Sequence, residues 1–411
     1  MNTNNTEMEN AFNKELNLIK DDLYYQQVEI KTKIKKKYIR FDVFYKPLEI
    51  LGGDSYSVRK TSDGNVVFFL VDAMGKGISA SITATSTTTL LNYIFDQMEK
   101  QNDFQFERWI KRYLEYIKKD LLDNEMLSIF FGFYHRKKAE FKYASFGMPA
   151  FLMLTENDEL KKVKSNNMPI NKYSDDYNIS STSIFEMKKA LFYSDGLCES
   201  CMENGDFYRE KMYLDFKDSK NIVDFISRVK LNLITEDDDM SFFYVDSLCS
   251  KKFSVNRNIK ANREDVDVAL HEISNYVKKN GASIKELSEI SLALSELLTN
   301  ALEHGVFGID NRKKHYLIEK DEFYDYLNVL EEKHKDDKII MRYSIKLEGE
   351  NRILVVRIED NGKGFDTRIL KNLVVNSQNF NGRGIMIVKK LLDRFYYNEK
   401  GNAVTIRKFL S

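Results

Sequence analysis

The chain has 411 residues, 43% of them hydrophobic, which is long enough for two or three domains with their own cores. Lys plus Arg and Asp plus Glu both number 63, so no net charge favours nucleic acid or an anionic membrane as a partner. No stretch reaches the roughly 18 apolar residues of a membrane span, and residues 1–10 lack a signal-peptide core, so we expect a cytoplasmic protein. The three cysteines, Cys198, Cys201 and Cys249, are expected to be free thiols.

Residues 1–38 are charged and helix-prone. Apolar residues recur at near-heptad spacing, although Gln26 and Lys33 interrupt the seam. The basic run 31–40 is typical of a solvated helix end. We therefore predict a connecting helix that also mediates homodimer formation.

Residues 39–247 combine strand-like apolar runs with two long helical segments near 78–98 and 103–123, which predicts an α/β sandwich. The predicted strands are FDVFYKP, NVVFFLVD, MLSIFFGFYH, AEFKYASF, AFLMLT, KALFYSD and DMSFFYVD. A stretch rich in basic and small residues, 248–258, is the predicted linker. Residues 259–411 then show two helices, two strands, a glycine-rich stretch, a helix and a last strand, which predicts a second α/β domain.

A Gly-Gly-Asp occurs at residues 52–54, in LEILGGDSY. Both a tight turn and a ligand site are physically reasonable there, because backbone without a side chain can approach a ligand closely. A diguanylate cyclase loop would continue with Glu-Phe, whereas Ser55 and Tyr56 follow here. The chain therefore lacks a carboxylate that cyclase chemistry needs.

Four aspartates stand next to apolar runs: Asp54, Asp72, Asp195 and Asp238. Taken singly, each is more often a turn residue than a ligand. Buried carboxylates are costly unless they are paired or bind a cation, so four of them can converge only around positive charge. Oxygen ligands without His or Cys suit Mg²⁺ or Mn²⁺.

The motifs GGDSY, VDAMGKG, YSDG and DDMS, in this order, resemble those of the metal-dependent protein phosphatase 2C-like (PPM) family. The similarity is greatest to its sporulation and stress-response branch, typified by SpoIIE and RsbU, over about residues 40–247. The resemblance implies an α-β-β-α sandwich and two metal ions sharing a water that attacks phosphoserine.

By that resemblance, Asp72 would bridge the two ions and the carbonyl of Ala73 would serve the second. Asp195 and Asp238 would complete the first ion, and Asp54 would hold metal-bound waters. The catalytic aspartates of the phosphatase would thus be Asp72, Asp195 and Asp238.

Two further positions follow from the same comparison. Asp239 stands where many relatives have Asp or Asn, and it is expected to support the ligands. Met74 stands where eukaryotic members often have a histidine proposed to protonate the leaving alcohol. A metal-bound water is therefore expected to protonate the leaving serine.

A second group of polar residues and glycines follows residue 290. Glu296 and Asn300 are four residues apart on a predicted helix, hence on one face. Glycines at a strand end and at a helix start let backbone N–H groups approach phosphates. The residues of these two boxes are Asp360, Gly362, Gly364, Gly382, Arg383 and Gly384.

This pattern resembles the GHKL ATPase fold, a two-layer α/β sandwich, and closely the serine-kinase anti-sigma factors typified by RsbW. The resemblance implies that Asn300 holds Mg²⁺ on the ATP phosphates, that catalytic Glu296 activates a serine or a water, and that Asp360 binds the adenine amino group. The glycines and the arginine of the boxes would line the nucleotide.

A histidine kinase is the obvious rival, because HEIS at 271–274 looks like a phosphoacceptor box. His271 lies only 29 residues before Asn300 (300 minus 271), which leaves no room for the helical hairpin of those enzymes. His304 is interpreted as a packing or capping residue. The charged insertion 306–337 has no assigned role.

The sequence therefore predicts a Mg²⁺- or Mn²⁺-dependent serine phosphatase fused to an ATP-dependent serine kinase or anti-sigma module. Both would act on a phosphorylated STAS-domain partner, with a sigma factor as a further candidate partner. The alternative is a phosphatase whose ATP-binding module transfers no phosphate and only sequesters a partner protein.

Overall fold

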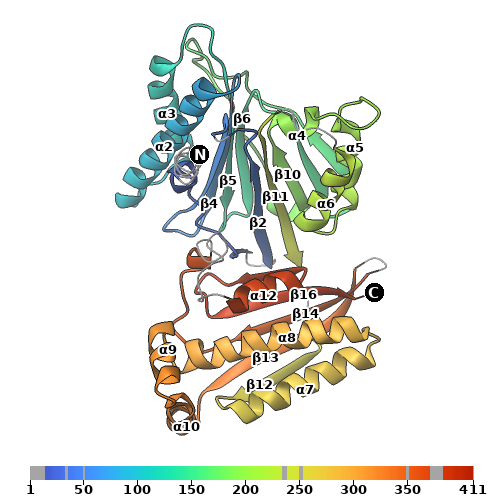
Figure 1. Ribbon diagram of the computed structural model, residues 1–411. Coiled ribbons are helices and arrows are strands. Elements are labelled where there is room, and N and C mark those ends of the chain that lie inside the picture. The colour runs from blue at the N-terminus through green and yellow to red at the C-terminus, as the bar shows by residue number, and fades with distance from the viewer. Residues whose placement is uncertain are drawn as a thin grey trace, which may run out of the picture. The chain divides into compact units, whose positions relative to one another are not determined.

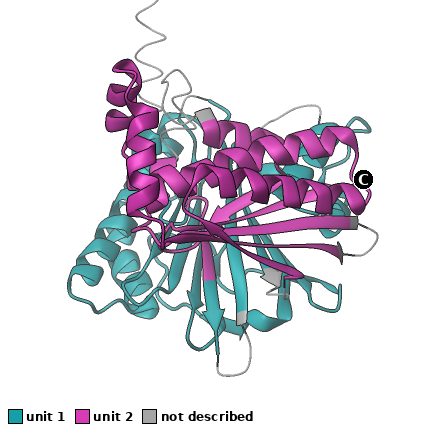
Figure 2. Cartoon of the chain, turned by 90° about the horizontal axis from the view of Figure 1, so that it is seen from below, with its two compact units in different colours: residues 1–23, 29–250 teal, residues 24–28, 251–411 magenta. Residues whose placement is uncertain are grey.

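The chain divides into two compact units, each with its own core (Figures 1 and 2). Unit 1 comprises residues 1–23 and 29–250, and unit 2 comprises residues 24–28 and 251–411. Within the described ranges, no helix is both long and apolar enough to cross a membrane. The computed structural model describes residues 14–32, 36–49, 51–233, 238–249, 253–348, 351–370 and 383–410.

Unit 1 is built on two sheets. One has the strand order β3-β4-β5-β6-β9 and the other the order β1-β2-β11-β10-β7-β8. The strands of the first sheet are β3 (Asp54–Lys60), β4 (Val66–Ala73), β5 (Leu127–His135), β6 (Glu140–Phe146) and β9 (Ser180–Ser183). Those of the second are β1 (Gln27–Lys31), β2 (Lys36–Lys46), β7 (Phe151–Thr155), β8 (Leu160–Val163), β10 (Met187–Tyr193) and β11 (Met240–Cys249). The helices are α2 (Ile78–Lys100), α3 (Phe106–Asp120), η1 (Ile184–Glu186), α4 (Asp195–Glu199), α5 (Arg209–Asp218) and α6 (Ile222–Asn232).

Side chains that alternate along β4 show how the layers of unit 1 are held together. Val67 and Phe69 pack into the cluster formed with α2 and α3. Phe68 points the other way, where its ring lies 5.1 Å from that of Phe192 on β10 and 5.0 Å from that of Phe243 on β11. A separate cluster joins the second sheet to α4, α5 and α6 (Figure 1). These layers confirm the predicted α-β-β-α sandwich.

The prediction of one N-terminal helix is wrong for the residues that the structure describes, whereas its role in homodimer formation stays a prediction. Instead of one helix, a short helix at 14–18 is followed by irregular chain and by strands β1 and β2. Residues 36–40 of the basic run lie in β2, where Lys37 is only 4% exposed. Its ammonium donates to Glu156 Oε1 at 2.6 Å and to two backbone carbonyls, so the buried charge is paired.

Unit 2 has one five-stranded antiparallel sheet in the order β12-β13-β14-β16-β15, packed against α7, α8 and α12. This two-layer arrangement confirms the predicted fold class. Its strands are β12 (Val255–Lys260), β13 (Lys338–Glu348), β14 (Asn351–Glu359), β15 (Arg394–Tyr397) and β16 (Ala403–Leu410). Its helices are α7 (Arg263–Lys279), α8 (Ile284–Asn300), the π-helical turn η2 (Ala301–Val306), α9 (Asn311–Glu319), α10 (Phe323–Lys333) and α12 (Arg383–Leu391).

Two helix starts of unit 2 carry the sequence signals expected of them. Asn262 accepts a hydrogen bond from the amide of Asp265 at the start of α7, and Ser283 with Glu286 forms a capping box at the start of α8. Segment 24–28, which includes the first two residues of β1, is grouped with this unit, and the amide of Tyr397 donates to the carbonyl of Tyr25 at 2.7 Å.

The prediction of free thiols is confirmed for the two cysteines whose side chains the structure describes. Cys198 is a buried free thiol and Cys201 is a partly exposed free thiol. The side chain of Cys249 lies outside the described part of the structure.

Candidate active sites

Two of the predicted aspartates meet at neighbouring strand ends in unit 1. Asp54, the first residue of β3, is the antiparallel partner of Asp72 near the end of β4. Asp54 is only 3% exposed. The amide of Ala73 donates to the carbonyl of Gly53 at 3.0 Å, which closes the two strand ends against each other.

The other two aspartates come from the second sheet. Asp195 begins helix α4 directly after β10, and its amide lies 3.4 Å from Asp72 Oδ2. Asp238 precedes β11, and its charge acts on both Asp72 and Asp195. Lys76, in the loop after β4, lies 3.4 Å from Asp238 Oδ2. The structure therefore brings all four predicted aspartates of unit 1 to one place, from both sheets.

Like charges in this cluster disfavour ionisation. Burial, and then the charge of Asp72, raise the pKa of Asp54 well above its ordinary value. Burial followed by Asp195 does the same to the pKa of Asp72, and burial followed by Asp238 raises the pKa of Asp195. A divalent cation would reverse each of these shifts, so the donor set suits a hard metal ion. Among the described residues, however, no three acidic, His or Cys side chains are already spaced as ligands of one ion.

The predicted polar pair of unit 2 lies on the wall of a large cavity. Asn300 Nδ2 donates to Glu296 Oε1 at 3.1 Å on the last turn of α8. The helix then continues as the π-helical turn η2, a feature that often marks functional sites. The cavity has a volume of about 840 Å³ and is also lined by Asp360, Gly362, Gly364 and Gly384.

Glycines in the wall of this cavity allow the backbone to pack closely against its acidic side chains. A Cβ on Gly384 would lie 1.7 Å from Glu296 Oε1, and one on Gly305 would lie 2.6 Å from the Asp360 carboxyl carbon. Burial raises the pKa of Asp360, although the amide of Gly362 donates to its carboxylate at 2.8 Å. Of the remaining predicted residues, Gly382 lies outside the described residues, and Arg383 begins α12.

Two family models match consecutive parts of the chain. Residues 62–247 match the model of stage II sporulation protein E (SpoIIE), and residues 259–408 match the histidine kinase-like ATPase domain. The chain joins a SpoIIE-type phosphatase domain to a histidine kinase-like ATPase domain. A search of curated proteins found no match.

The solved structures to which the chain is similar are distant in sequence, and the TM-scores of the three described here are below 0.5. The RsbU and RsbW domains of Rv1364c from Mycobacterium tuberculosis are 15% identical, over 93% of this chain and 94% of that chain, with a TM-score of 0.48. The phosphatase domain and a regulatory fragment of SpoIIE from Bacillus subtilis are 20% identical, over 51% and 63%, with a TM-score of 0.42. RsbX in complex with magnesium is 14% identical, over 54% and 100%, with a TM-score of 0.41.

Two residues that support the aspartates of the phosphatase domain have weak or no sequence signals. Ser194 Oγ donates to Asp54 Oδ2 at 2.6 Å and accepts from the amide of Ser241 at 3.1 Å. Asp239 accepts from the amides of Leu48, at 2.6 Å, and Gly53. The family resemblance indicates the position of Asp239. Ser194 lies inside the YSDG motif, but the sequence does not predict its role, because its partners lie 140 and 47 residues away in the chain.

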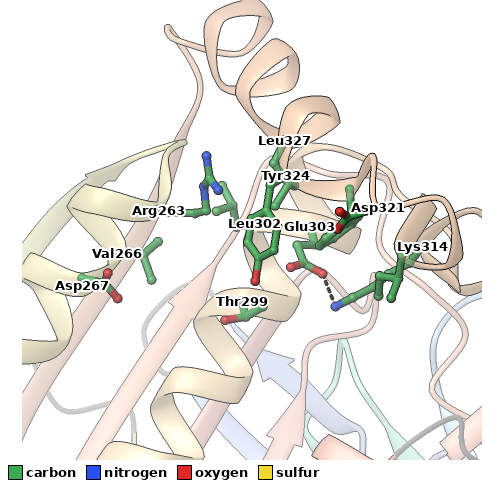
Figure 3. Close-up of a pocket in the computed structure, with 12 residues that line it drawn as sticks. Arg263, Val266, Asp267, Thr299, Leu302, Glu303, Lys314, Asp321, Tyr324 and Leu327 are labelled. Atoms are coloured by element: carbon green, nitrogen blue, oxygen red, sulfur yellow. Dashed lines mark hydrogen bonds and ion pairs between the residues drawn. The ribbon is translucent and has the colours of Figure 1, made fainter.

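The insertion of the ATPase domain forms helices α9 and α10, and a second cavity of about 420 Å³ lies between them and α7, α8 and η2 (Figure 3). Buried Glu303 and half-buried Lys314 form an ion pair there at 2.5 Å. Lys314 also lines the larger cavity. The insertion thus contributes a wall to both cavities.

The structure also places the two histidines that were discussed with the histidine-kinase alternative. His271 is exposed in the middle of α7, the first helix of the domain. His304 is exposed and lines the larger cavity, and its Nδ1 lies 2.5 Å from the carbonyl oxygen of Ile309, a capping contact at the end of η2.

Proposed function

We propose that this chain is a metal-dependent protein-serine phosphatase joined to an ATP-dependent protein-serine kinase, and that both act on one serine of a STAS-domain partner. The phosphatase half is supported by one observation above all. Four buried or half-buried aspartates converge from two sheets. Among the contacts described above, only Lys76, which lies beside Asp238, brings a positive charge to them, so their negative charge is not balanced by these contacts. A bound divalent cation would neutralise the cluster while its carboxylates stay ionised.

Each aspartate then has a role that fits its position. Asp72, at the centre of the cluster, would bridge two Mg²⁺ or Mn²⁺ ions, and the Ala73 carbonyl would serve the second. Asp195 and Asp238 would complete the first ion, and Asp54 would hold its waters. Bound divalent metal lowers the pKa of a coordinated water toward neutrality, which supplies the nucleophile.

The kinase half is supported by the cavity that Glu296 and Asn300 share with Asp360. Asn300 would hold the Mg²⁺ of ATP, and Glu296, 3.1 Å away, would take the proton of the accepting serine. Asp360 would accept a hydrogen bond from the adenine amino group. Gly362, Gly364, Gly382, Arg383 and Gly384 would line the nucleotide.

The partner assignment rests on the resemblance of the ATPase domain to serine-kinase anti-sigma factors. A STAS-domain protein would be phosphorylated by one half and dephosphorylated by the other. A sigma factor would be the further partner, bound by the ATPase domain.

Two variants separate the two activities. With ATP and a STAS-domain partner, Asn300→Ala should leave the partner serine unphosphorylated, because the Mg²⁺ ligand at the ATP phosphates is lost. Asp195→Ala should drive the serine toward full phosphorylation, because only hydrolysis is impaired. Intact-mass spectrometry of the partner reads both outcomes. If Asp195→Ala binds ATP but accumulates no phosphorylated partner, the ATPase domain only sequesters its partner and the kinase proposal is wrong.

A further inference from the structure

The first described residues of the chain belong to the phosphatase domain, although they lie upstream of the part that matches the SpoIIE family model. The amide of Val58 on β3 donates to the carbonyl of Lys20 at 2.7 Å, and the amide of Asp22 donates to the carbonyl of Val58 at 2.9 Å. Asp22 also accepts from the amide of Lys60 at 3.0 Å. Segment 18–22 therefore pairs with β3, which ends the strand order of its sheet.

The helix that precedes this pairing brings a carboxylate to the aspartate cluster. Glu15 is only 6% exposed. Its Oε1 accepts from the hydroxyl of Tyr45 at 2.9 Å and from the amide of Gly52 at 3.3 Å. Gly52 is two residues before Asp54. A buried carboxylate is costly, and this one makes its hydrogen bonds to the turn that leads into Asp54.

A second carboxylate holds the same turn. Asp239 accepts from the amides of Gly53 and Asp54, so three successive amides of the turn are bonded to side chains from distant parts of the chain. The same turn also accepts a hydrogen bond, because the amide of Ala73 donates to the carbonyl of Gly53 at 3.0 Å. Moving this turn would displace both Asp54 and the backbone next to Asp72.

We propose that Glu15 is a positioning residue of the metal centre, which fixes the Gly52–Asp54 turn and through it the Asp54 carboxylate. The inference rests on the proposed function, because it presupposes that the aspartate cluster binds metal. It assigns the N-terminal segment to the construction of the phosphatase site, a role distinct from that of a spacer.

The experiment measures Mn²⁺ binding by isothermal titration calorimetry in the full chain, together with unfolding by urea in EDTA. Glu15→Ala should weaken Mn²⁺ binding about tenfold, as loss of a group that orients metal ligands typically does. Glu15→Gln should weaken it less, because the amide oxygen still accepts from Gly52. Tyr45→Phe should weaken binding alone but add little to Glu15→Ala, because both act through the same oxygen.

The matched control is Asp22→Asn, which perturbs the same segment at its contacts with Arg59 and Lys60. It should lower the urea midpoint and change the Mn²⁺ dissociation constant less than twofold. If Glu15→Ala and Glu15→Gln lower the midpoint as this control does but bind Mn²⁺ like wild type, Glu15 is merely structural and the inference is overturned.

A further variant separates failure of the inference from failure of the proposed function. Asp72→Asn should abolish Mn²⁺ binding at the cluster. If it does while the Glu15 variants bind normally, only the role of Glu15 is wrong. If wild type binds no Mn²⁺, or Asp72→Asn binds it equally well, the metal centre itself is wrong and the inference falls with it.

Discussion

Replacing Asp72 by Asn should make the metal-free phosphatase domain more stable while removing its metal site. Asp72 is half-buried and faces the charges of Asp195 and Asp238. Two unit charges about 5 Å apart repel by about 3 kcal/mol at an effective dielectric constant of about 20. Partial protonation of the cluster relieves some of this repulsion, so we expect the free energy of unfolding at pH 8 to rise by about 1–3 kcal/mol in EDTA.

The pH dependence has a definite sign. The pKa values of Asp54, Asp72 and Asp195 are raised in the folded protein, so the folded state binds more protons than the unfolded state above the ordinary aspartate pKa. The stability of metal-free wild type should therefore fall as pH rises from about 4 toward the raised values. The gain from Asp72→Asn should accordingly be smaller at pH 5.5 than at pH 8.

The chain offers a selective probe for this measurement. Trp109 is the single tryptophan, and it is fully buried in the phosphatase domain, where its Nε1 donates to the carbonyl of Leu91. Tryptophan fluorescence during urea unfolding of the full chain therefore reports this domain. Mn²⁺ at 100 times its dissociation constant should add about 2.7 kcal/mol to wild type and nothing to Asp72→Asn. Equal or lower stability of Asp72→Asn in EDTA at pH 8 would refute the view that the cluster carries uncompensated charge.

Three further predictions concern single positions. Gly384→Ala should weaken ATP binding at least tenfold, measured by calorimetry, because its Cβ would lie 1.7 Å from Glu296 Oε1. An unchanged affinity would contradict this and show that helix α12 can move away from Glu296. Burial lowers the pKa of Lys189 to about 7, so the unfolded state binds more protons up to about pH 10 and wild-type stability should rise from pH 7 to that pH. Lys189→Met should abolish this pH-dependent rise in the free energy of unfolding, measured with urea. An equal rise in both proteins would contradict the prediction. Asp239→Ala should lose about 2–4 kcal/mol of unfolding free energy through its unpaired turn amides, whereas Asp238→Ala should lose less than about 1 kcal/mol; similar losses would contradict the contrast.

The strands that carry the aspartates were predictable because their burial leaves a strong pattern. The run NVVFFLVD became β4, which is buried on both faces between the helices and the second sheet, so it reads as continuous apolar residues. Asp72 could then be placed near its end. By contrast, β3 was not predicted as a strand, because its residues DSYSVRK include only two apolar side chains, Tyr56 and Val58, which is too short an alternation to stand out.

The N-terminal segment shows why local patterns mislead. Lys20 and Asp22 look like the polar face of a helix, but backbone pairing with Val58 decides their conformation. Two signals in the sequence pointed the right way. Gln26 interrupts the heptad seam, and Val28 and Ile30, both buried, are spaced two residues apart as in a strand.

Both sites combine an acid with a neighbouring glycine, and this explains which of their residues could be found. A Cβ on Gly196, beside Asp195, would lie 2.0 Å from the carbonyl oxygen of Asp239, and a Cβ on Gly384 would lie 1.7 Å from the side-chain oxygen Oε1 of Glu296. Such positions need two unusual residue types together, so they leave a motif in the sequence. The groups that hold the acids in place donate or accept through backbone amides and hydroxyls, which many residues can do equally well. Ser194 stands inside the YSDG motif but the motif does not reveal its role, and Glu15 belongs to no motif, so only the folded chain shows their hydrogen bonds to Asp54 and to the turn before it.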